Sequence, residues 1–305
     1  MKKPLKISTF PYELESPWHG PDHPGLLVKV EWPQQVVGYA DLHPWPELGD
    51  EDLNAQIKSL NEVAPLPLMK RAIAIAFQDG VARREGRSLY TGFKIPFSHL
   101  LVPDFLTIEA SDLAYWREQG YRYLKVKLGK DLESETKQLH AMAEIGGSDF
   151  KWRLDFNASL SPSDFNAWLE RNKGLWPLID SIEDPASSVT GVVTQSVPLF
   201  ADRAGDFENW HRVIKPETED IPPRHPEKRF IFTNNLGHPY GHGVAMALAA
   251  RAGTEEVCGL QGLQHYAPSV WTESVRYHGP VCLPPVGTGF GFDPMLKKLQ
   301  WKRQI

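Results

Sequence analysis

The sequence lacks the features that mark several classes of protein. Its two cysteines, Cys258 and Cys282, are too few for a disulfide framework and form no zinc-like spacing. We therefore expect both to be buried packing residues in a reducing compartment. Basic residues are not in excess, because 33 Lys and Arg oppose 38 Asp and Glu, for a net charge of −5. That balance argues against nucleic acid as a partner, since binding a phosphate backbone depends on clustered positive charge.

Long apolar runs are also absent. Residues 1–6 carry the positive charge of a signal peptide, but no apolar run follows them. No stretch approaches the roughly 20 apolar residues of a membrane-spanning helix. We therefore expect a cytoplasmic protein that has no membrane partner. The sequence carries no signature of the oligomeric state.

At 305 residues the chain exceeds the usual single domain, and its first part reads as a unit of its own. Residues 6–15 and 25–39 are predicted to be strands, the second broken by a hairpin turn at 33–35. Helical patterns follow at 51–63 and 67–85. These elements predict an α+β unit that covers residues 1–95.

From about residue 96, short apolar strands alternate with helical or loop segments, which is typical of βα repeats. Eight strands close a βα barrel, whose chemistry lies at the carboxyl ends of the strands. We expect the barrel to cover residues 96–279, with weak helices after the fourth, fifth and sixth strands. We also expect a helix at 265–278 and a tail, 280–305, that returns to the first unit. The eight predicted strands are 97–102, 123–128, 150–156, 179–183, 197–202, 212–215, 229–234 and 257–263.

Two lysines end the second predicted barrel strand. Lys125 and Lys127 are two residues apart, so alternation along a strand points both side chains into the mouth of the barrel. The alternative is a lysine pair on an exposed edge strand, but a buried parallel strand has no water-facing side. Nearby ammonium groups disfavour each other's charged form, and burial adds to that effect. We therefore expect lowered lysine pKa values, which suit a base near neutral pH.

Carboxylates end the next three strands. Asp155 lies in the alternating series Arg153, Asp155, Asn157, and Glu183 and Asp202 close the fourth and fifth strands. Taken singly, an acid at such a position is more often a helix cap or a salt-bridge partner than a metal ligand. Three acids that converge from consecutive strands repel one another unless a cation lies between them. Because oxygen ligands suit magnesium or manganese rather than zinc, the pattern predicts a divalent-metal site.

A third lysine and two asparagines follow on the next strands. Lys215 closes the sixth strand, which the curvature of a barrel places roughly across the mouth from Lys127. A substrate would then lie between the two lysines. Asn234 and Asn235 end the seventh strand, where they either bind a substrate carboxylate or carbonyl or form an ordinary turn. We interpret His238, just beyond them, as a loop residue.

Taken in order, the strand ends form a recognisable set, namely Lys125-x-Lys127, Asp155-x-Asn157, Glu183-Asp184-Pro185, Asp202 and Lys215-Pro216. This set resembles the enolase superfamily, in its muconate-lactonizing subgroup. The short chain and the Arg-x-Asp-x-Asn sequence look most like the o-succinylbenzoate synthases of menaquinone biosynthesis. The resemblance implies an α/β fold, a modified TIM-type βα barrel with an N-terminal α+β capping domain. Loops of that domain, near 16–24 and 43–50, would close over the substrate.

The resemblance also implies a role for each residue. Lys127 would be the catalytic base and Lys215 a cationic partner. The expected reaction is the syn-dehydration of 2-succinyl-6-hydroxy-2,4-cyclohexadiene-1-carboxylate to 2-succinylbenzoate. The implied ligands of Mg²⁺, or Mn²⁺, are Asp155, Glu183 and Asp202. Their positions at strand ends, rather than the resemblance, make Lys125, Asn234 and Asn235 the expected contacts of a small-molecule carboxylate substrate.

Other functions stay open at this point. Racemisation of an N-acylamino acid or epimerisation of a dipeptide also needs two lysines on opposite faces, so the sequence separates it poorly from dehydration. A sugar-acid dehydratase would place an aspartate at the sixth-strand position, where this chain has Lys215. A non-catalytic small-molecule-binding barrel has no use for buried lysines opposite three acids, because unpaired buried charge is costly.

Overall fold

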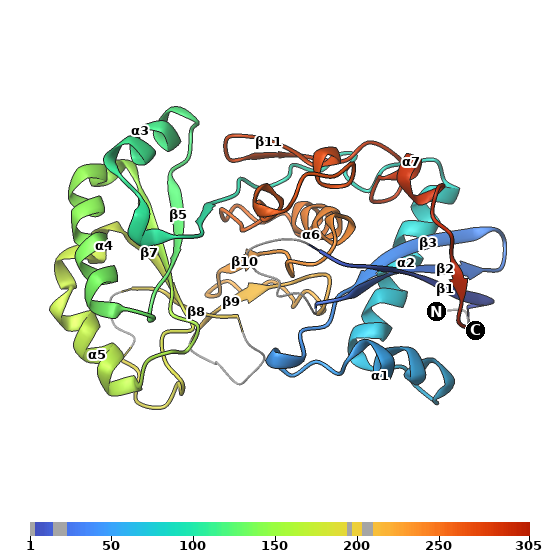
Figure 1. Cartoon of the computed structure of the whole chain (residues 1–305), viewed down its shortest axis with the longest axis horizontal. Helices are drawn as coiled ribbons and strands as arrows, with labels where there is room; N and C mark the ends of the chain where they lie inside the picture. The colour runs from blue at the N-terminus through green and yellow to red at the C-terminus, as the bar shows by residue number, and fades with distance from the viewer. Residues whose placement is uncertain (1–3, 15–22, 194–196, 203–209) are drawn as a thin grey trace.

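An antiparallel sheet made from both ends of the chain lies beside a curled parallel sheet (Figure 1). The structure is a computed structural model that describes residues 4–14, 23–193, 197–202 and 210–305. The antiparallel sheet has the strand order β13-β1-β2-β3. Its strands are β1 (Lys6–Tyr12), β2 (Gly25–Trp32), β3 (Val36–Leu42) and β13 (Lys302–Arg303).

The predicted hairpin is confirmed, because β2 and β3 pair antiparallel from Leu26–Leu42 to Trp32–Val36. Gln34 and Gln35 in its turn both have positive φ, the twist that suits a tight hairpin. β13 pairs with β1 and brings the C-terminal tail back to this sheet. The division into a capping domain of residues 1–95 with 280–305 and a barrel of 96–279 stays a prediction.

Two helices follow the hairpin, α1 (Leu53–Lys58) and α2 (Pro67–Arg84). α1 is shorter than the pattern predicted, since residues 59–61 form a 3-10 turn. α2 packs on β3 so closely that a Cβ at Gly38 would clash with the backbone of Ala76. Only glycine permits that approach, and it lets the helix cover the sheet and bury a shared apolar core.

A buried ion pair joins α2 to the C-terminal tail. Asp79 is fully buried and accepts hydrogen bonds from Arg83 Nε at 2.5 Å, Tyr39 N at 3.0 Å and Phe290 N at 2.8 Å. Burial raises the pKa of the Asp79 carboxyl, although Arg83 and the two backbone N–H groups oppose that shift. The ionised carboxylate therefore depends on its partners.

We expect Arg83→Met to lower the free energy of unfolding by about 3–5 kcal/mol, because it leaves the buried carboxylate without its cation. The double variant Asp79→Asn/Arg83→Met removes both charges and should be more stable than Arg83→Met alone. Urea unfolding of the three proteins checks this. If the double variant were less stable than Arg83→Met, the Asp79 carboxyl would stabilise the folded protein even without Arg83, and the expectation would be contradicted.

The parallel sheet has the strand order β10-β9-β8-β7-β6-β5-β4. These seven strands match the first seven predicted barrel strands. Their bounds are β4 (Leu100–Val102), β5 (Tyr123–Lys127), β6 (Lys151–Asp155), β7 (Ile179–Glu183), β8 (Leu199–Ala201), β9 (His211–Ile214) and β10 (Phe230–Phe232).

The predicted eighth strand at 257–263 is wrong as a strand. Among the described residues, this segment makes only two isolated parallel bridges, Ser98 to Cys258 and Thr233 to Gly259. Those bridges lie between the extensions of β4 and β10, so the segment still closes the barrel. Glycines 259 and 262 have no side chain to pack on a strand surface, and the pairing stops after two residues.

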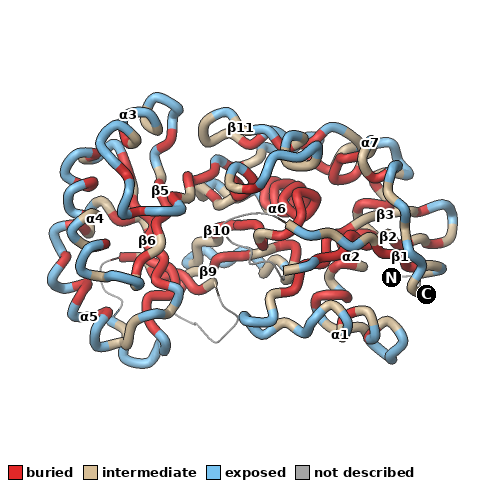
Figure 2. Tube along the Cα trace, in the orientation of Figure 1, coloured by how far each residue is buried: buried red, intermediate tan, exposed pale blue. Residues whose placement is uncertain are grey.

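Helices α3 (Ala110–Glu118), α4 (Leu132–Gly146) and α5 (Pro162–Arg171) cover the outside of the first barrel strands (Figure 1). Within the described residues no helix follows β7, β8 or β9, in line with the weak patterns there. α6 (Pro239–Ala252) follows β10 and is buried along most of its length (Figure 2).

The predicted helix at 265–278 is wrong. The segment contains parts of two 3-10 turns, at 263–265 and 272–274, and strand β11 (Arg276–His278), which pairs with β12 (Val281–Leu283). Pro268 is the fourth residue of this segment and cannot donate a helical hydrogen bond. A last short helix, α7 (Asp293–Leu296), precedes β13.

Cys258 and Cys282 are both buried and unbridged, as predicted. No helix in the described ranges is long and apolar enough to cross a membrane.

Candidate active site

A cavity of about 880 Å³ opens at the carboxyl ends of the parallel strands. Trp45, Glu47 and Leu48, from the loop that follows β3, form part of its wall. The structure therefore brings the predicted residues together in one space that the N-terminal unit helps to enclose. All eight line it: Lys125, Lys127, Asp155, Glu183, Asp202, Lys215, Asn234 and Asn235.

Strand register places three of these side chains in one row. Lys127 of β5 pairs with Asp155 of β6, which pairs in turn with Glu183 of β7. Neighbouring partners in a parallel sheet project to the same face, so the base candidate and two carboxylates share one level of the barrel. Lys125 lies two residues below Lys127 and points the same way.

Lys125 is held by the carboxylates above it. Its Nζ lies 2.8 Å from both oxygens of Glu183 and 3.0 Å from Asp155 Oδ2. Burial alone would lower the pKa of Lys125, but Asp155, Glu183 and Asp202 raise it well above its ordinary value. The prediction that both lysines have lowered pKa values is therefore wrong for Lys125, because the adjacent strand supplies its counter-charges.

The crowded acids change the pKa of Glu183. Burial raises the pKa of its carboxyl to about 8, and repulsion from Asp155 and Asp202 adds to the shift while Lys125 opposes it. One ammonium group thus does not fully compensate the acids that converge here. The site favours further positive charge.

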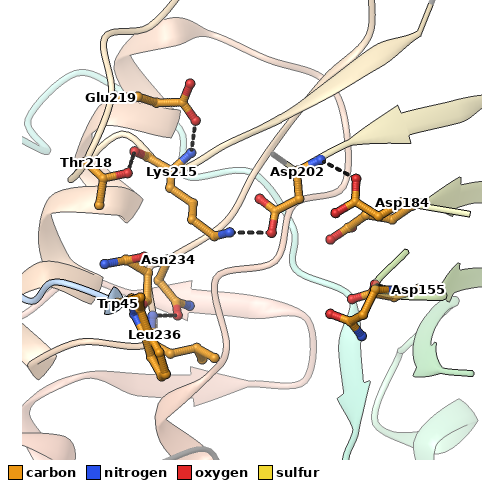
Figure 3. A network of polar contacts seen from close by, with 12 residues as sticks. Trp45, Asp155, Asp184, Asp202, Lys215, Thr218, Glu219, Asn234 and Leu236 are labelled. Atoms are coloured by element: carbon orange, nitrogen blue, oxygen red, sulfur yellow. Dashed lines mark hydrogen bonds and ion pairs between the residues drawn. The ribbon is translucent and has the colours of Figure 1, made fainter. Parts of the chain in front are cut away.

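A second ion pair lies at the ends of the next two strands. Lys215 extends toward Asp202 and donates to its Oδ2, with Asp184 and Asp155 beyond (Figure 3). Asp202 is fixed by its backbone N–H, which donates to Asp184 Oδ1 at 3.2 Å. Burial lowers the pKa of Lys215, but Asp202 more than offsets that effect and the net shift is upward. Lys215 is therefore a stable cation.

Lys127 differs from the other two lysines. Its pKa is lowered, mainly by burial and further by the charges of Lys125 and Lys215, although Asp155 and Glu183 oppose the change. A lysine in this setting reaches its neutral, proton-accepting form more readily than an exposed one.

The described residues contain no group of three His, Cys, Asp or Glu side chains placed to hold a metal ion. Asp155 and Glu183 face the ammonium of Lys125, whereas Asp202 faces that of Lys215. The three predicted ligands thus line one cavity, each with a cationic group against it.

The two asparagines have protein partners. Asn234 Nδ2 donates to Gly259 O at 3.2 Å, and Asn235 Nδ2 donates to His43 O at 2.9 Å. Trp45 Nε1 also donates to Asn235 O at 2.9 Å. Asn235 therefore ties the N-terminal unit to the barrel, and contact of either asparagine with substrate stays a prediction.

The loop predicted at 43–50 does reach the cavity, through Trp45, Glu47 and Leu48. Most of the other predicted loop, 16–24, lies outside the described residues. His238 does not line the cavity. It is the N-cap residue of α6, and its Nδ1 accepts a hydrogen bond from Tyr240 N at 3.1 Å.

Two polar residues in the wall, His99 and Thr233, were not predicted as site residues. His99 and Leu101 alternate on the first barrel strand as Lys125 and Lys127 do on the second, so period-two spacing was a usable signal. A histidine away from the end of a strand is ordinarily a packing residue, and its chemistry depends on neighbours that the sequence does not specify.

Comparison with known proteins identifies the family. The family model described as "O-succinylbenzoate synthase, N-terminal domain" matches residues 8–82. The o-succinylbenzoate synthase of Bdellovibrio bacteriovorus is 30% identical over 328 residues, which cover 97% of this chain and 98% of that protein. The chain belongs to the o-succinylbenzoate synthase family. This membership confirms the predicted place in the enolase superfamily.

Racemases and epimerases are also similar to this member of the family. An N-succinyl-L-Arg/Lys racemase of Bacillus cereus is 25% identical over 65% of this chain and 64% of its own length. The crystal structure of a dipeptide epimerase from Enterococcus faecalis, in complex with Mg and the dipeptide L-Leu-L-Tyr, matches with a TM-score of 0.74 at 15% identity. That match covers 95% of this chain and 99% of the epimerase, and confirms the barrel with an N-terminal antiparallel unit.

Proposed function

We propose that this protein is an o-succinylbenzoate synthase that catalyses the magnesium-dependent loss of water from 2-succinyl-6-hydroxy-2,4-cyclohexadiene-1-carboxylate. Family membership supports the substrate. The observation that carries the reaction type is the 30% identity to an o-succinylbenzoate synthase over 97% of this chain.

A dehydration that uses one base needs one lysine that transfers protons and one that stays charged. Lys127 has a lowered pKa, and Lys215 has a raised pKa and an ion pair with Asp202. In each direction, racemisation uses one neutral and one protonated lysine on opposite faces, and the two exchange these roles when the direction reverses. The unlike lysines therefore suit dehydration and a single direction of racemisation alike, and the similarity to an o-succinylbenzoate synthase favours dehydration.

The acidic residues fit a divalent cation. The ammonium group of Lys125 lies between the carboxylates of Asp155 and Glu183, where a cation is favoured. The raised pKa of Glu183 indicates that this one positive charge does not balance the negative charge of the acids. Carboxylate oxygens are the ligands that magnesium prefers. We propose that Asp155, Glu183 and Asp202 hold the ion. When bound, magnesium stabilises the negative charge that develops on the substrate carboxylate.

The remaining chemistry belongs to the lysines. Neutral Lys127 Nζ removes the proton from the ring carbon that carries the carboxylate. The protonated Lys127 then donates that proton to the hydroxyl group leaving from the same face of the ring. The C–H and C–O bonds break, a ring double bond forms, water departs and Lys127 returns to its neutral form. Lys215 remains a cation throughout and stabilises the negative charge of the intermediate, while formation of an aromatic ring drives the reaction.

The second candidate is racemisation of an N-succinylamino acid, which the similarity to the Bacillus cereus racemase favours. In that reaction Lys215 would also transfer protons. The two proposals therefore differ in what they demand of one residue.

Lys215→Arg separates them, since arginine keeps the positive charge but does not deprotonate at accessible pH. In a synthase this variant should dehydrate the cyclohexadiene at a rate within about 100-fold of the wild type, the scale of perturbing one electrostatic group. The measurement is the initial rate of absorbance loss of that substrate.

The accompanying control is exchange of the α-hydrogen of each enantiomer of an N-succinylamino acid in heavy water. A racemase would exchange both enantiomers as wild type, and only one after Lys215→Arg. Rapid exchange of both by the wild type, without turnover of the cyclohexadiene, would replace the synthase proposal with the racemase one.

A further inference from the structure

His99, Thr233 and Gly259 line the cavity where the two edges of the parallel sheet come together. His99 directly precedes β4, Thr233 directly follows β10, and Gly259 lies in the segment that joins these two edges of the sheet. The carboxylates end β6 and β7 and follow β8, in the middle of the strand order. A ligand that reached from one group to the other would span the barrel mouth.

The imidazole of His99 has a fixed tautomer. Its Nδ1 lies 3.1 Å from Nη1 of Arg153, and a guanidinium group only donates hydrogen bonds. Nδ1 must therefore accept, which places the ring proton on Nε2. Arg153 is itself anchored by Asp180 Oδ2 at 2.8 Å and by Val257 O at 2.7 Å. Burial, with the charges of Arg153 and Lys125, also holds the pKa of His99 well below its ordinary value, so the ring is neutral.

The Nε2–H group of His99 has no acceptor among the described residues, and the residue lines the cavity with 5% of its surface exposed. The nearby charge that acts on it, Lys125, is a cation and a donor. Because His99 lines the cavity, this N–H group is available to bond an oxygen atom supplied from it.

Gly259 keeps that position open. A Cβ there would lie 2.9 Å from His99 Nε2, so any larger residue would cover the N–H group. The same Cβ would lie 2.7 Å from Cγ2 of Thr233. The Thr233 hydroxyl oxygen is buried and has no partner in the described part of the chain. Rotation about the Cα–Cβ bond exchanges its methyl and hydroxyl groups and would turn the hydroxyl toward the same space.

We propose that His99 and Thr233 form a subsite that binds an uncharged carbonyl oxygen, and that Gly259 leaves the space for this oxygen because it has no side chain. Both donors are neutral, and Lys125 is already committed to Asp155 and Glu183, so the subsite matches a ketone better than a second carboxylate. This inference rests on the proposed function, under which the ligand atom is the keto oxygen of the succinyl side chain. The subsite would orient that side chain while the ring carboxylate lies at the acids.

The test compares two ligands by titration calorimetry in the presence of magnesium. One is the product, 2-succinylbenzoate, and the other is 4-(2-carboxyphenyl)butanoate, in which a methylene group replaces the ketone. The wild type should bind the ketone about tenfold more tightly, the scale of one net hydrogen bond to a buried donor.

Two pairs of variants test which residues cause the preference for the ketone ligand. His99→Asn keeps an oxygen that can accept from Arg153 but loses the donor at Nε2, whereas His99→Gln places an amide donor near Nε2. Thr233→Val removes the hydroxyl and Thr233→Ser keeps it. We expect His99→Asn and Thr233→Val to weaken ketone binding severalfold to tenfold and to leave the methylene ligand unchanged, while the Gln and Ser variants retain much of the preference.

The outcomes separate the two proposals. If the wild type binds both ligands equally, the subsite is wrong and the synthase proposal stands. If it binds neither, the synthase proposal is wrong and the subsite falls with it. Equal weakening of both ligands by His99→Asn and Thr233→Val would assign these residues a structural role and overturn the subsite. If His99→Asn does not fold, the wild-type preference and Thr233→Val decide the question.

Discussion

Lys127→Ala is expected to lower the dehydration rate by about 10³- to 10⁴-fold, the upper range for removal of a general acid or base. Lys127 is the lysine of the cavity whose pKa is lowered, and in the proposed mechanism it both removes the ring proton and protonates the leaving hydroxyl. The rate should depend on the neutral amine, so in the wild type it should rise with pH and level off below the ordinary lysine range. Initial rates from pH 6 to 10 measure both effects.

The matched control is Lys130→Ala. Lys130 is an exposed lysine on the loop that follows the same strand, and it lines the cavity without a role in the mechanism. Its loss should change the rate by less than about tenfold, the scale of an exposed charge. Circular dichroism should show both variants folded. Retention of most activity by Lys127→Ala would remove it as the base.

Glu183→Gln is expected to abolish magnesium binding and, with it, turnover. In the wild type, saturating magnesium should raise the unfolding free energy by about 2.7 kcal/mol at 100 times its dissociation constant. The variant should show little such stabilisation, because a neutral amide replaces a central carboxylate. The measurement is urea unfolding with and without magnesium.

The metal-free proteins should also differ in their pH dependence. The folded pKa of Glu183, about 8, lies above the ordinary value of 4.5, so its stabilising contribution is present below 4.5 and is lost as pH rises toward 8. Metal-free wild type should therefore lose stability over that window more than Glu183→Gln does. Asp180→Asn, on the same strand but ion-paired to Arg153 and Arg229, serves as the control. It should be destabilised yet keep its response to magnesium, and a Glu183→Gln protein that kept the response would exclude Glu183 as a ligand.

Much of the fold follows from local sequence. The hairpin of β2 and β3 was predictable because its turn and its apolar strands lie within about 20 residues of each other. The segments 257–263 and 265–278 were predicted wrongly as a strand and a helix. Glycine residues limit strand pairing in the first, and a proline disfavours a helix in the second. In the first case, long-range bridges at Cys258 and Gly259 close the barrel where a full strand was expected.

The candidate site also has features that the sequence predicts and features that it does not. Alternation along each strand sufficed to bring Lys127, Asp155 and Glu183 to one cavity, because barrel geometry fixes where strand ends meet. It did not reveal that Lys125 lies between two carboxylates, because that contact depends on register across three strands. His99 was missed for a related reason, since Arg153 sets its tautomer from another strand.

The most direct test of the proposed function is an assay of the purified protein with 2-succinyl-6-hydroxy-2,4-cyclohexadiene-1-carboxylate, in which absorbance of the diene is followed with magnesium and with a chelator. We predict rapid loss of the diene and formation of 2-succinylbenzoate with magnesium, and no loss above the uncatalysed rate with the chelator. An unchanged diene in the presence of magnesium, from a folded protein that binds the ion, would contradict the synthase assignment.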